Sequence, residues 1–133
     1  MIPEFNDERY LPVGVHRATM DEIGARFGQE SELRRVQMES LVWLVDLARR
    51  AGAERIFVNG SFVTDKSEPN DVDCALLIGK DFPRDAAAET ELLAGLPFVE
   101  IHLLRAEQFE RFVEKIFGTD RILTPKGMIE VIL

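Results

Sequence analysis

Apolar side chains recur every three or four residues within residues 31–51, and this period predicts an amphipathic helix with one face in a core. Ser31 is a favourable N-cap residue, and Gly52 is a favourable stop. Arg34 lies off the apolar stripe, so we expect its side chain on the polar face of this helix. The stripe consists of Leu33, Val36, Leu41, Leu44, Leu47 and Ala48.

Three further segments have the signals of helices. Thr19–Glu22 is a capping box, in which the Thr and Glu side chains each bond the other's backbone amide. It predicts a short helix that ends at about Phe27. We expect a second helix from Pro83 to about Ala94, and a third over residues 106–117, where apolar side chains again have helical spacing.

Short runs rich in apolar and β-branched residues alternate with these helices and predict strands at residues 55–59, 72–78, 98–104 and 127–133. Residues 1–18 have no clear period, so we expect an extended N-terminal arm or loop. This order of elements predicts an α/β (α+β) fold with a small mixed sheet flanked by helices. The length of 133 residues is typical of a single domain, here residues 1–133.

Composition narrows the classes of function. Apolar residues make up 46% of the chain, enough for a packed core, and the net charge of −8 argues against broad, non-specific binding to DNA or RNA. The single cysteine, Cys74, excludes an internal disulfide framework. No signal peptide and no apolar run of membrane-spanning length is visible, so we expect a cytoplasmic protein that has no membrane partner.

Two polar motifs stand at the ends of neighbouring predicted strands. Gly60 and Ser61 leave the first strand, where a glycine lets the backbone approach a phosphate and the hydroxyl and the following amides supply donors. Asp71 and Asp73 are expected to begin the next strand, and strand alternation points both carboxylates to one face. Such a pair repels unless a cation lies between its members, and Mg²⁺, for which Mn²⁺ can substitute, is the natural ligand.

Other charged residues can join this site. Glu100 lies between apolar residues of the third predicted strand, and it can join the two aspartates if that strand is their neighbour. His102 falls on the same face as Glu100. Lys66, in the loop between the motifs, could reach a phosphate. Lys126 precedes Gly127 and fits either a turn or a nucleotide contact.

The pattern resembles the signature of the nucleotidyltransferase (polymerase-β-like) superfamily: Gly60-Ser61, nine residues, Asp71-Val72-Asp73, and later an apolar–Glu–apolar triplet. More narrowly, the chain is similar to small bacterial nucleotidyltransferase-fold proteins of unknown function. That likeness rests on Gly60–Lys66, Pro69–Asp73, Leu11–Thr19 and Pro125–Ile129.

This resemblance implies a minimal nucleotidyltransferase fold. Asp71, Asp73 and a third carboxylate would bind Mg²⁺, and Gly60 and Ser61 would hold the nucleotide phosphates. Two departures are visible: Glu100 stands where Asp is commoner, and no second substrate-binding domain is evident.

Two functions are therefore expected. The first is Mg²⁺-dependent transfer of a nucleoside monophosphate from a nucleoside triphosphate to an unidentified hydroxyl on RNA, a protein or a small molecule. The alternative is a non-catalytic nucleotide-binding or interaction module with a protein partner, such as the antitoxin half of a toxin–antitoxin pair. Glu100 discriminates between them, because catalysis needs it beside the aspartates. Turn chemistry at Asn70-Asp71 and an ordinary exposed Glu100 remain the structural alternatives.

Overall fold

The computed structural model describes residues 1–120 and 122–133, with only the backbone described at Ile116. The strands within these residues are β1 Val15–Ala18, β2 Arg55–Asn59, β3 Val72–Leu77, β4 Val99–Leu104 and β5 Met128–Val131. They form one open sheet in the order β1-β5-β2-β3-β4. The pairs β1–β5 and β3–β4 are parallel, whereas β2 runs antiparallel to both β5 and β3. The expected α+β fold with a mixed sheet is confirmed.

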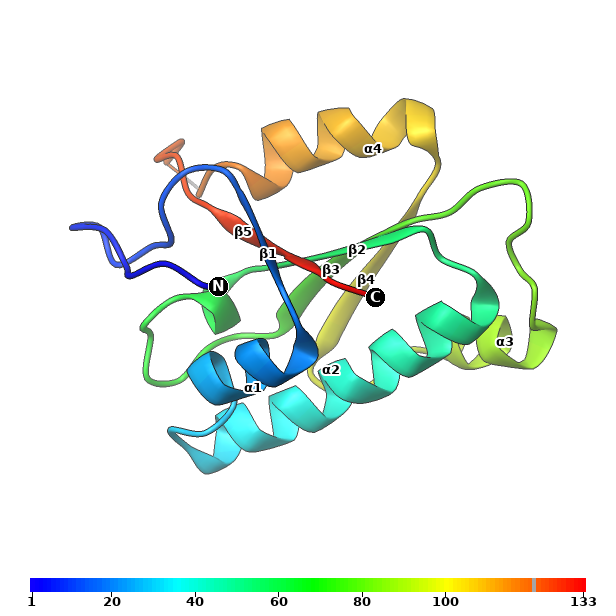
Figure 1. Ribbon diagram of the computed structural model, residues 1–133, viewed down its shortest axis with the longest axis horizontal. Helices are drawn as coiled ribbons and strands as arrows, with labels where there is room; N and C mark the ends of the chain where they lie inside the picture. Colours follow the sequence, from blue (N-terminus) through cyan, green and yellow to red (C-terminus); the bar gives the residue numbers. More distant parts are fainter. Residues whose placement is uncertain (121) are drawn as a thin grey trace.

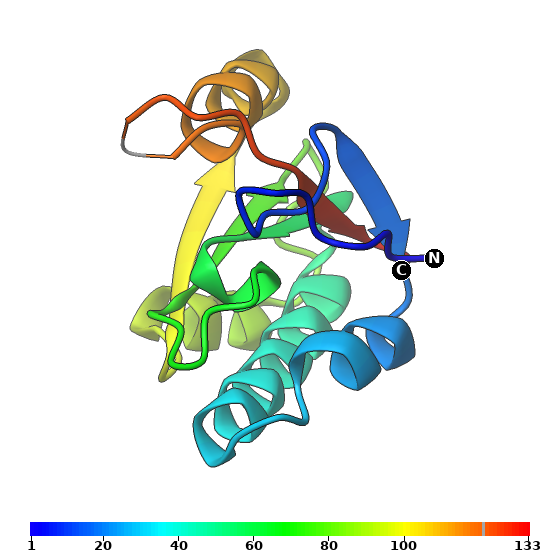
Figure 2. The same ribbon diagram turned by 90° about the vertical axis from the view of Figure 1, so that its left-hand side faces the viewer.

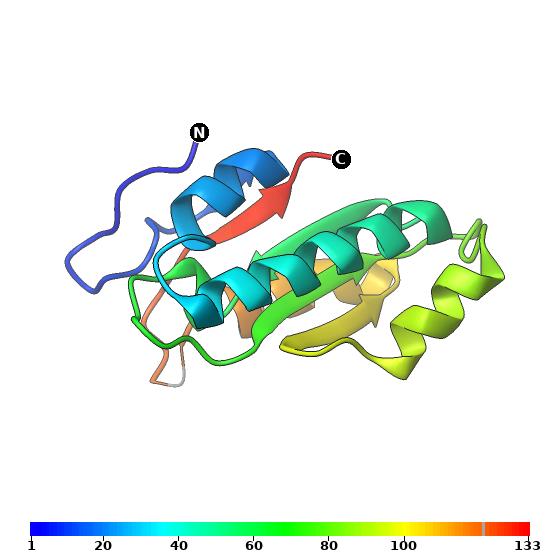
Figure 3. The same cartoon turned by 90° about the horizontal axis from the view of Figure 1, so that it is seen from below.

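Helices cover both faces of this sheet. Their bounds are α1 Met20–Phe27, α2 Glu32–Ala51, α3 Ala86–Ala94 and α4 Ala106–Phe112, and α4 continues into a π-helical turn, Val113–Phe117. Figure 1 shows α4 on one face and α1, α2 and α3 on the other. Figure 3 looks onto that second face, where α2 lies between α1 and α3. Within the described part of the chain, no helix is both long and apolar enough to cross a membrane.

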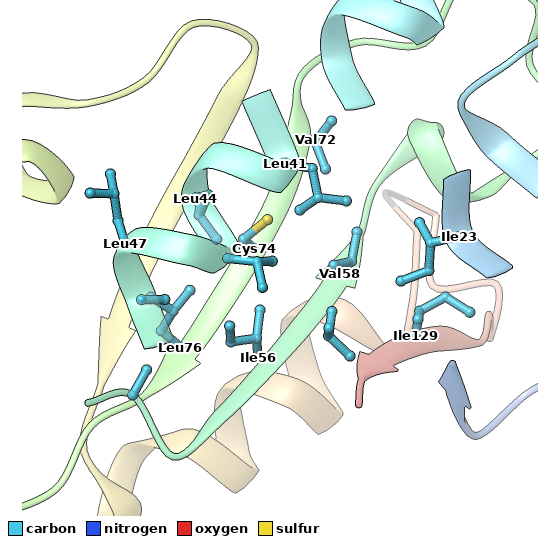
Figure 4. Close-up of a cluster of buried hydrophobic side chains, with 14 of the residues drawn as sticks. Ile23, Leu41, Leu44, Leu47, Ile56, Val58, Val72, Cys74, Leu76 and Ile129 are labelled. Carbon is cyan, nitrogen blue, oxygen red and sulfur yellow. The ribbon is translucent and has the colours of Figure 1, made fainter. Parts of the chain in front are cut away.

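The main core lies between the sheet and the long helix α2. Figure 4 shows apolar side chains of α2 meeting those of the central strands β2 and β3. The labelled members are Ile23, Leu41, Leu44, Leu47, Ile56, Val58, Val72, Cys74, Leu76 and Ile129. Cys74 is fully buried, and this burial raises the pKa of its thiol. The predicted stripe of α2 therefore faces the sheet from Leu41 to Ala48, whereas Leu33 and Val36 are only half-buried and lie outside this core.

A smaller apolar cluster fixes α4 on the opposite face. The rings of Phe57 on β2 and Phe109 on α4 meet edge to face, with centroids 5.1 Å apart. Arg55 lies over Phe57 and makes a two-pronged contact with Glu130 of β5 at 2.9 and 2.8 Å. These contacts hold α4 at a set position above β2. The π-helical turn that follows α4 is thereby placed beside the end of β2.

Several predicted boundaries are confirmed. Thr19 and Glu22 form the capping box at the start of α1, and the Ser31 hydroxyl accepts the amide of Arg34 at the start of α2. Strand β2 has the predicted bounds.

Two expectations at the ends of elements were wrong. Residues 15–18 belong to the sheet as β1, so the N-terminal arm ends at Gly14. Among the described residues, this four-residue edge strand pairs with β5 alone, at the far end of the chain, and so has no local signature. Helix α3 begins at Ala86 rather than Pro83, because the Asp85 carboxylate caps the amides of the first turn.

Arg34 contradicts the expectation of a polar-face position, because its side chain is only 2% exposed. One guanidinium nitrogen donates to the carbonyl oxygens of Phe27 and Phe62, at 3.1 and 2.7 Å. The other donates to those of Thr64 and Lys66, at 2.8 and 2.6 Å. A single helix side chain thus binds three carbonyls of the loop that follows β2. The helical period could not reveal this, because the acceptors lie in a loop distant in sequence.

Gln37, one turn further along α2, extends the same attachment. Its amide nitrogen donates to the carbonyl oxygens of Pro69 and Asn70, at 3.2 and 2.8 Å. Arg34 and Gln37 together hold both ends of the segment 62–70 against the helix.

Replacing Arg34 with Met should lower the free energy of unfolding by about 3 kcal/mol, since buried carbonyl groups would lose their donors. Arg35→Met is the matched control: that neighbour is exposed and should change stability by less than about 0.5 kcal/mol. Urea unfolding followed by circular dichroism measures both. Equal effects of the two substitutions would show that the buried hydrogen bonds are not what stabilises the loop.

Candidate functional site

A cleft of about 1240 Å³ opens at the end of the sheet where β2 finishes and β3 begins. In Figure 2 this end faces the viewer, and the green loop after β2, the blue N-terminal arm and the orange-to-red segment before β5 converge there. Seven of the residues that the sequence singled out line the cleft, and His102 does not; the seven are Gly60, Ser61, Lys66, Asp71, Asp73, Glu100 and Lys126.

Asp73 and Glu100 form the centre of the site. They are direct partners in the parallel register of β3 and β4, which confirms that these strands are neighbours. The pKa of Asp73 is raised to about 6, first by burial, then by the negative charge of Glu100 and by hydrogen bonding to it. The two carboxylates therefore contact each other, and Asp73 releases its proton at a higher pH than an exposed aspartate does.

Asp71 does not complete a three-carboxylate cluster as expected. It lies one residue ahead of β3, and its side chain is exposed. Its charge is the smallest of the influences that raise the pKa of Asp73. Among the described residues, no three His, Cys, Asp or Glu side chains converge closely enough to hold a metal ion as they stand. Strand β3 begins at Val72, so Asp71 lies one residue ahead of the pleat that was expected to align it with Asp73.

Gly60 is required where the chain passes closest to Asp73. Its φ of +85° and ψ of −173° are a backbone conformation that is essentially confined to glycine. A Cβ atom at this position would lie 2.7 Å from Oδ2 of Asp73. Gly60 was expected to let the backbone approach a phosphate, which stays a prediction; the neighbour that the structure shows at this point is the Asp73 carboxylate.

Ser61 starts a short 3₁₀ turn, Ser61–Val63, and closes the loop. Its hydroxyl oxygen accepts the amide of Asn70 at 2.7 Å, which leaves the hydroxyl proton available to donate. The amides of Val63 and Thr64 are used within the turn, where they donate to Gly60 and Ser61. The hydroxyl, rather than those two amides, is therefore the donor that the turn offers to a ligand.

His102 supports Glu100 from the side. Nε2 of His102 lies 3.5 Å from Oε1 of Glu100, which confirms that the two share a face of β4. The imidazole packs against the ring of Phe112, with centroids 4.8 Å apart. His102 is thus anchored by an aromatic neighbour and faces the carboxylate that faces Asp73.

The N-terminal arm also contributes to this site, which was not predicted from the sequence. Arg9 and Tyr10 both line the cleft. Arg9 lies 3.6 Å from Asp65, and the Tyr10 hydroxyl donates to Asp120 at 2.8 Å. The arm thereby joins the loop after β2 to the segment before β5. Neither residue lies in a recognisable motif, so only the fold could reveal them.

Asn59, the last residue of β2, was also missed. Its side chain is 2% exposed, and its amide nitrogen donates to the carbonyl oxygen of Phe117 at 2.8 Å. This bond ties the end of β2 to the end of the α4 segment, directly beside Gly60.

One family model matches residues 3–132, almost the whole chain, and it is described as a family of unknown function, DUF6932. The chain belongs to DUF6932. No curated protein and no solved structure matches this member of DUF6932 significantly. The family description thus names no activity.

The residues present fit a hard divalent cation. Burial and the negative charge of Glu100 raise the pKa of Asp73, so a cation bound beside the Asp73–Glu100 pair would stabilise the ionised form of Asp73. Mg²⁺ commonly uses one or two protein carboxylates and completes its shell with water and substrate phosphates. The contacting carboxylates of Asp73 and Glu100, with Asp71 nearby, would therefore supply as many protein ligands as such an ion commonly uses.

Gly60→Ala should destabilise the fold more than Gly95→Ala does. Gly95 has nearly the same φ, +88°, but a Cβ there would meet nothing within 4 Å. Backbone strain should cost about 1–3 kcal/mol at either glycine, and the Asp73 contact adds to that cost only at Gly60. In an Asp73→Ala background, the extra destabilisation that Gly60→Ala causes relative to Gly95→Ala should disappear. The coupling energy between Gly60→Ala and Asp73→Ala should then exceed about 0.5 kcal/mol. Additive effects of Gly60→Ala and Asp73→Ala would mean that no close approach exists.

The raised pKa of Asp73 predicts a specific dependence of stability on pH. Between the unfolded pKa, 3.8, and about 6, the folded state holds a proton that the unfolded state has released. The free energy of unfolding should therefore fall as pH rises through this window and level off above it. Asp73→Asn, which cannot titrate, should lack this decline. Denaturant titrations from pH 4 to 8 test this, and parallel curves for the two proteins would refute the raised pKa.

Proposed function

We propose that this protein binds a Mg²⁺–nucleoside triphosphate in the cleft and transfers the nucleoside monophosphate to a hydroxyl acceptor. The observation that carries the proposal is the contact between Asp73 and Glu100, a carboxylate pair short of positive charge, directly beside the Gly60-Ser61 turn. An acidic pair next to a backbone turn with a free hydroxyl donor suits a metal-bound polyphosphate better than an uncharged ligand.

In this reaction the acceptor oxygen forms a bond to the α-phosphorus, and the bond from that phosphorus to the pyrophosphate oxygen breaks. Bound Mg²⁺ would neutralise charge on the phosphates, held there by Asp73 and Glu100 with Asp71 within reach. Glu100, whose side chain is 60% exposed, is the carboxylate that an incoming hydroxyl can approach to give up its proton. Ser61 donates its hydroxyl proton to a phosphate oxygen, and Lys66 lies on the same wall.

The position of Glu100 favours an enzyme over a non-catalytic module. A nucleotide-binding module needs no proton acceptor beside the metal carboxylates, whereas group transfer to a hydroxyl does. Glu100 is the direct strand partner of Asp73, which supports catalysis, although Asp71 does not complete the expected cluster of three carboxylates. An antitoxin-like role in a toxin–antitoxin pair remains the competing proposal, and it predicts nucleotide binding without turnover or no nucleotide binding at all.

The acceptor is an RNA, protein or small-molecule hydroxyl. The net charge of −8 favours acceptors that do not require a long polyanion to lie across the surface. A cytoplasmic site of action, where nucleoside triphosphates and Mg²⁺ are available together, belongs to the same proposal.

Isothermal titration calorimetry with ATP and GTP, each with and without Mg²⁺, tests the binding half of this proposal. Binding should require the metal, because free phosphates and unneutralised carboxylates repel each other. Asp73→Asn and Glu100→Gln should weaken binding by at least about tenfold, the effect of losing one contact worth 1.4 kcal/mol. Asp65→Asn removes a charge from the same cleft outside the carboxylate pair and serves as the control. Metal-independent binding, or equal losses in all three variants, would contradict the proposal.

Incubation with α-³²P-labelled nucleoside triphosphate and lysate of the source cell tests the transfer half. The wild type should label an acceptor in the presence of Mg²⁺, whereas Glu100→Gln should not. Tight Mg²⁺-dependent binding without any labelled product would move the assignment to the non-catalytic module.

A further inference from the structure

Strand β4 is the outermost strand on its side of the sheet, and among the described residues it pairs with β3 alone. Figure 2 shows it as the yellow arrow at one margin of the sheet. It is six residues long, whereas β1 at the opposite edge has four residues. A long open edge presents unpaired amide and carbonyl groups to any strand that can align with it. Strand β4 is therefore the edge of this sheet that is better suited to pair with a further strand.

The parallel ladder with β3 determines which backbone groups of β4 point outward. At its two ends, the amide of Val72 donates to the carbonyl oxygen of Phe98 at 2.8 Å, and the amide of Ile78 donates to that of Leu104 at 2.9 Å. Bonds in a parallel ladder are evenly spaced, and alternate residues bond to the same neighbour. The even-numbered residues of β4 thus bond β3, and the odd-numbered residues point their amides and carbonyls to the open edge. These residues are Val99, Ile101 and Leu103.

The polar residues of β4 form a complementary pair. The side chains of Val99, Ile101 and Leu103 pack against the main core, so the polar pair lies on the other face of the strand. Its members are Glu100 and His102, whose side chains are 60% and 30% exposed. A carboxylate only accepts hydrogen bonds at neutral pH, whereas an imidazole always has an N–H to donate. A strand that carries both, two residues apart, can match a second copy of itself.

Two copies of one strand align about a two-fold axis in antiparallel orientation, and hydrogen bonding then requires odd-numbered residues to face odd-numbered residues. An axis at Glu100 sets two carboxylates opposite each other, which repel, and an axis at His102 leaves both carboxylates without an imidazole opposite them. An axis at Ile101 places Glu100 of each copy opposite the partner's His102. It also places Val99 opposite the partner's Leu103, so every outward backbone group has a partner. The axis at Ile101 therefore satisfies both the backbone and the polar side chains.

Exposed apolar side chains flank this edge. Phe98, directly before β4, is 41% exposed, and Leu93, on the helix α3 that leads into the strand, is 66% exposed. Figure 3 shows α3 beside β4. Hydrogen bonds to a strand edge replace bonds to water and contribute little net affinity, so a stable interface also needs apolar area to bury. Phe98 and Leu93 offer such area next to the open strand.

We propose that this protein forms a two-fold dimer in which β4 pairs antiparallel with the β4 of a second copy about an axis at Ile101, so that the two sheets join into one. This inference goes beyond the proposed function and does not depend on it. Because Glu100 also lines the cleft, the dimer brings the partner's His102 next to the candidate site of each copy.

Sedimentation equilibrium measures the mass in solution. The wild type should approach twice the chain mass of 15.1 kDa as its concentration rises. His102→Glu sets carboxylates opposite carboxylates on both sides of the axis and should raise the dimer dissociation constant by at least about tenfold. Combining Glu100→His with His102→Glu exchanges the two partners and should restore the constant to within about threefold of the wild type. Gln29→Glu, the control, adds a negative charge at an exposed loop position and should change the constant by less than about twofold.

Hydrogen exchange of the backbone amides tests where the two copies meet. At a concentration that favours the dimer, the amides of Ile101 and Leu103 should exchange slowly, because they donate across the interface, and dilution should make them exchange faster. The control is the amide of Arg17 on β1. The ladder bonds at Gly14 and Ala18 show that the even-numbered residues of β1 bond β5, so the Arg17 amide also points to an open edge. It should exchange fast at both concentrations.

The outcomes decide both the dimer and its register. A wild type that stays monomeric at about 1 mM, where even a millimolar dissociation constant would populate the dimer, overturns the proposal. A dimer in which the Ile101 amide exchanges as fast as that of Arg17 also overturns it, because such a dimer uses another face.

A second variant keeps the register testable if His102→Glu does not fold. Glu100→Lys changes a side chain that is 60% exposed and removes the acceptor opposite the partner's His102, so it should also raise the dissociation constant. An unchanged constant for the variant that folds refutes the register at Ile101. Neither measurement includes a nucleotide, so the dimer and the proposed function succeed or fail separately.

Discussion

The parallel pairing of β3 with β4 is the constraint on which the rest of this structure depends, because it forces Asp73 and Glu100 side by side at the end of the sheet. Neighbouring strands are about 5 Å apart, so two ionised carboxylates in direct register repel strongly. The protein relieves this repulsion only partly: it raises the pKa of Asp73 and places Lys126 nearby. Such residual strain is uncommon in a purely structural position, and a bound cation would remove it.

The surroundings of the carboxylate pair are held rigidly, although the cleft itself is lined by loops. Arg34 and Gln37 fix the loop after β2 from below, through carbonyl groups rather than through side chains. The Ser61 hydroxyl then joins the two ends of that loop by accepting the amide of Asn70. A site of this kind is preorganised, so a ligand would not have to pay the full entropy of ordering the loop. The buried charge of Arg34 is costly, and its carbonyl partners are what make it tolerable.

The parts of this structure that the sequence predicts are those with a local cause. Helix α2 follows from its apolar period, and Gly60 from a turn between a strand and a loop. The proximity of Glu100 to Asp73 was a conditional prediction, correct because β4 does lie beside β3. Strand β1 and the buried Arg34 have no local cause, because each depends on a partner distant in the chain. Asp71 shows the opposite failure: strand alternation was extended one residue beyond the point where the strand begins.

The most direct test of the account is to locate a bound divalent ion by paramagnetic broadening in ¹⁵N-labelled protein. Substoichiometric Mn²⁺ broadens amide resonances steeply with proximity, so the first signals to disappear should be those of Gly60, Ser61, Asp73 and Glu100. Asp73→Asn should abolish this selective loss while leaving the rest of the spectrum unchanged. Broadening spread over the acidic surface, or centred away from the β3–β4 end of the sheet, would contradict the claim that the carboxylate pair is a metal site.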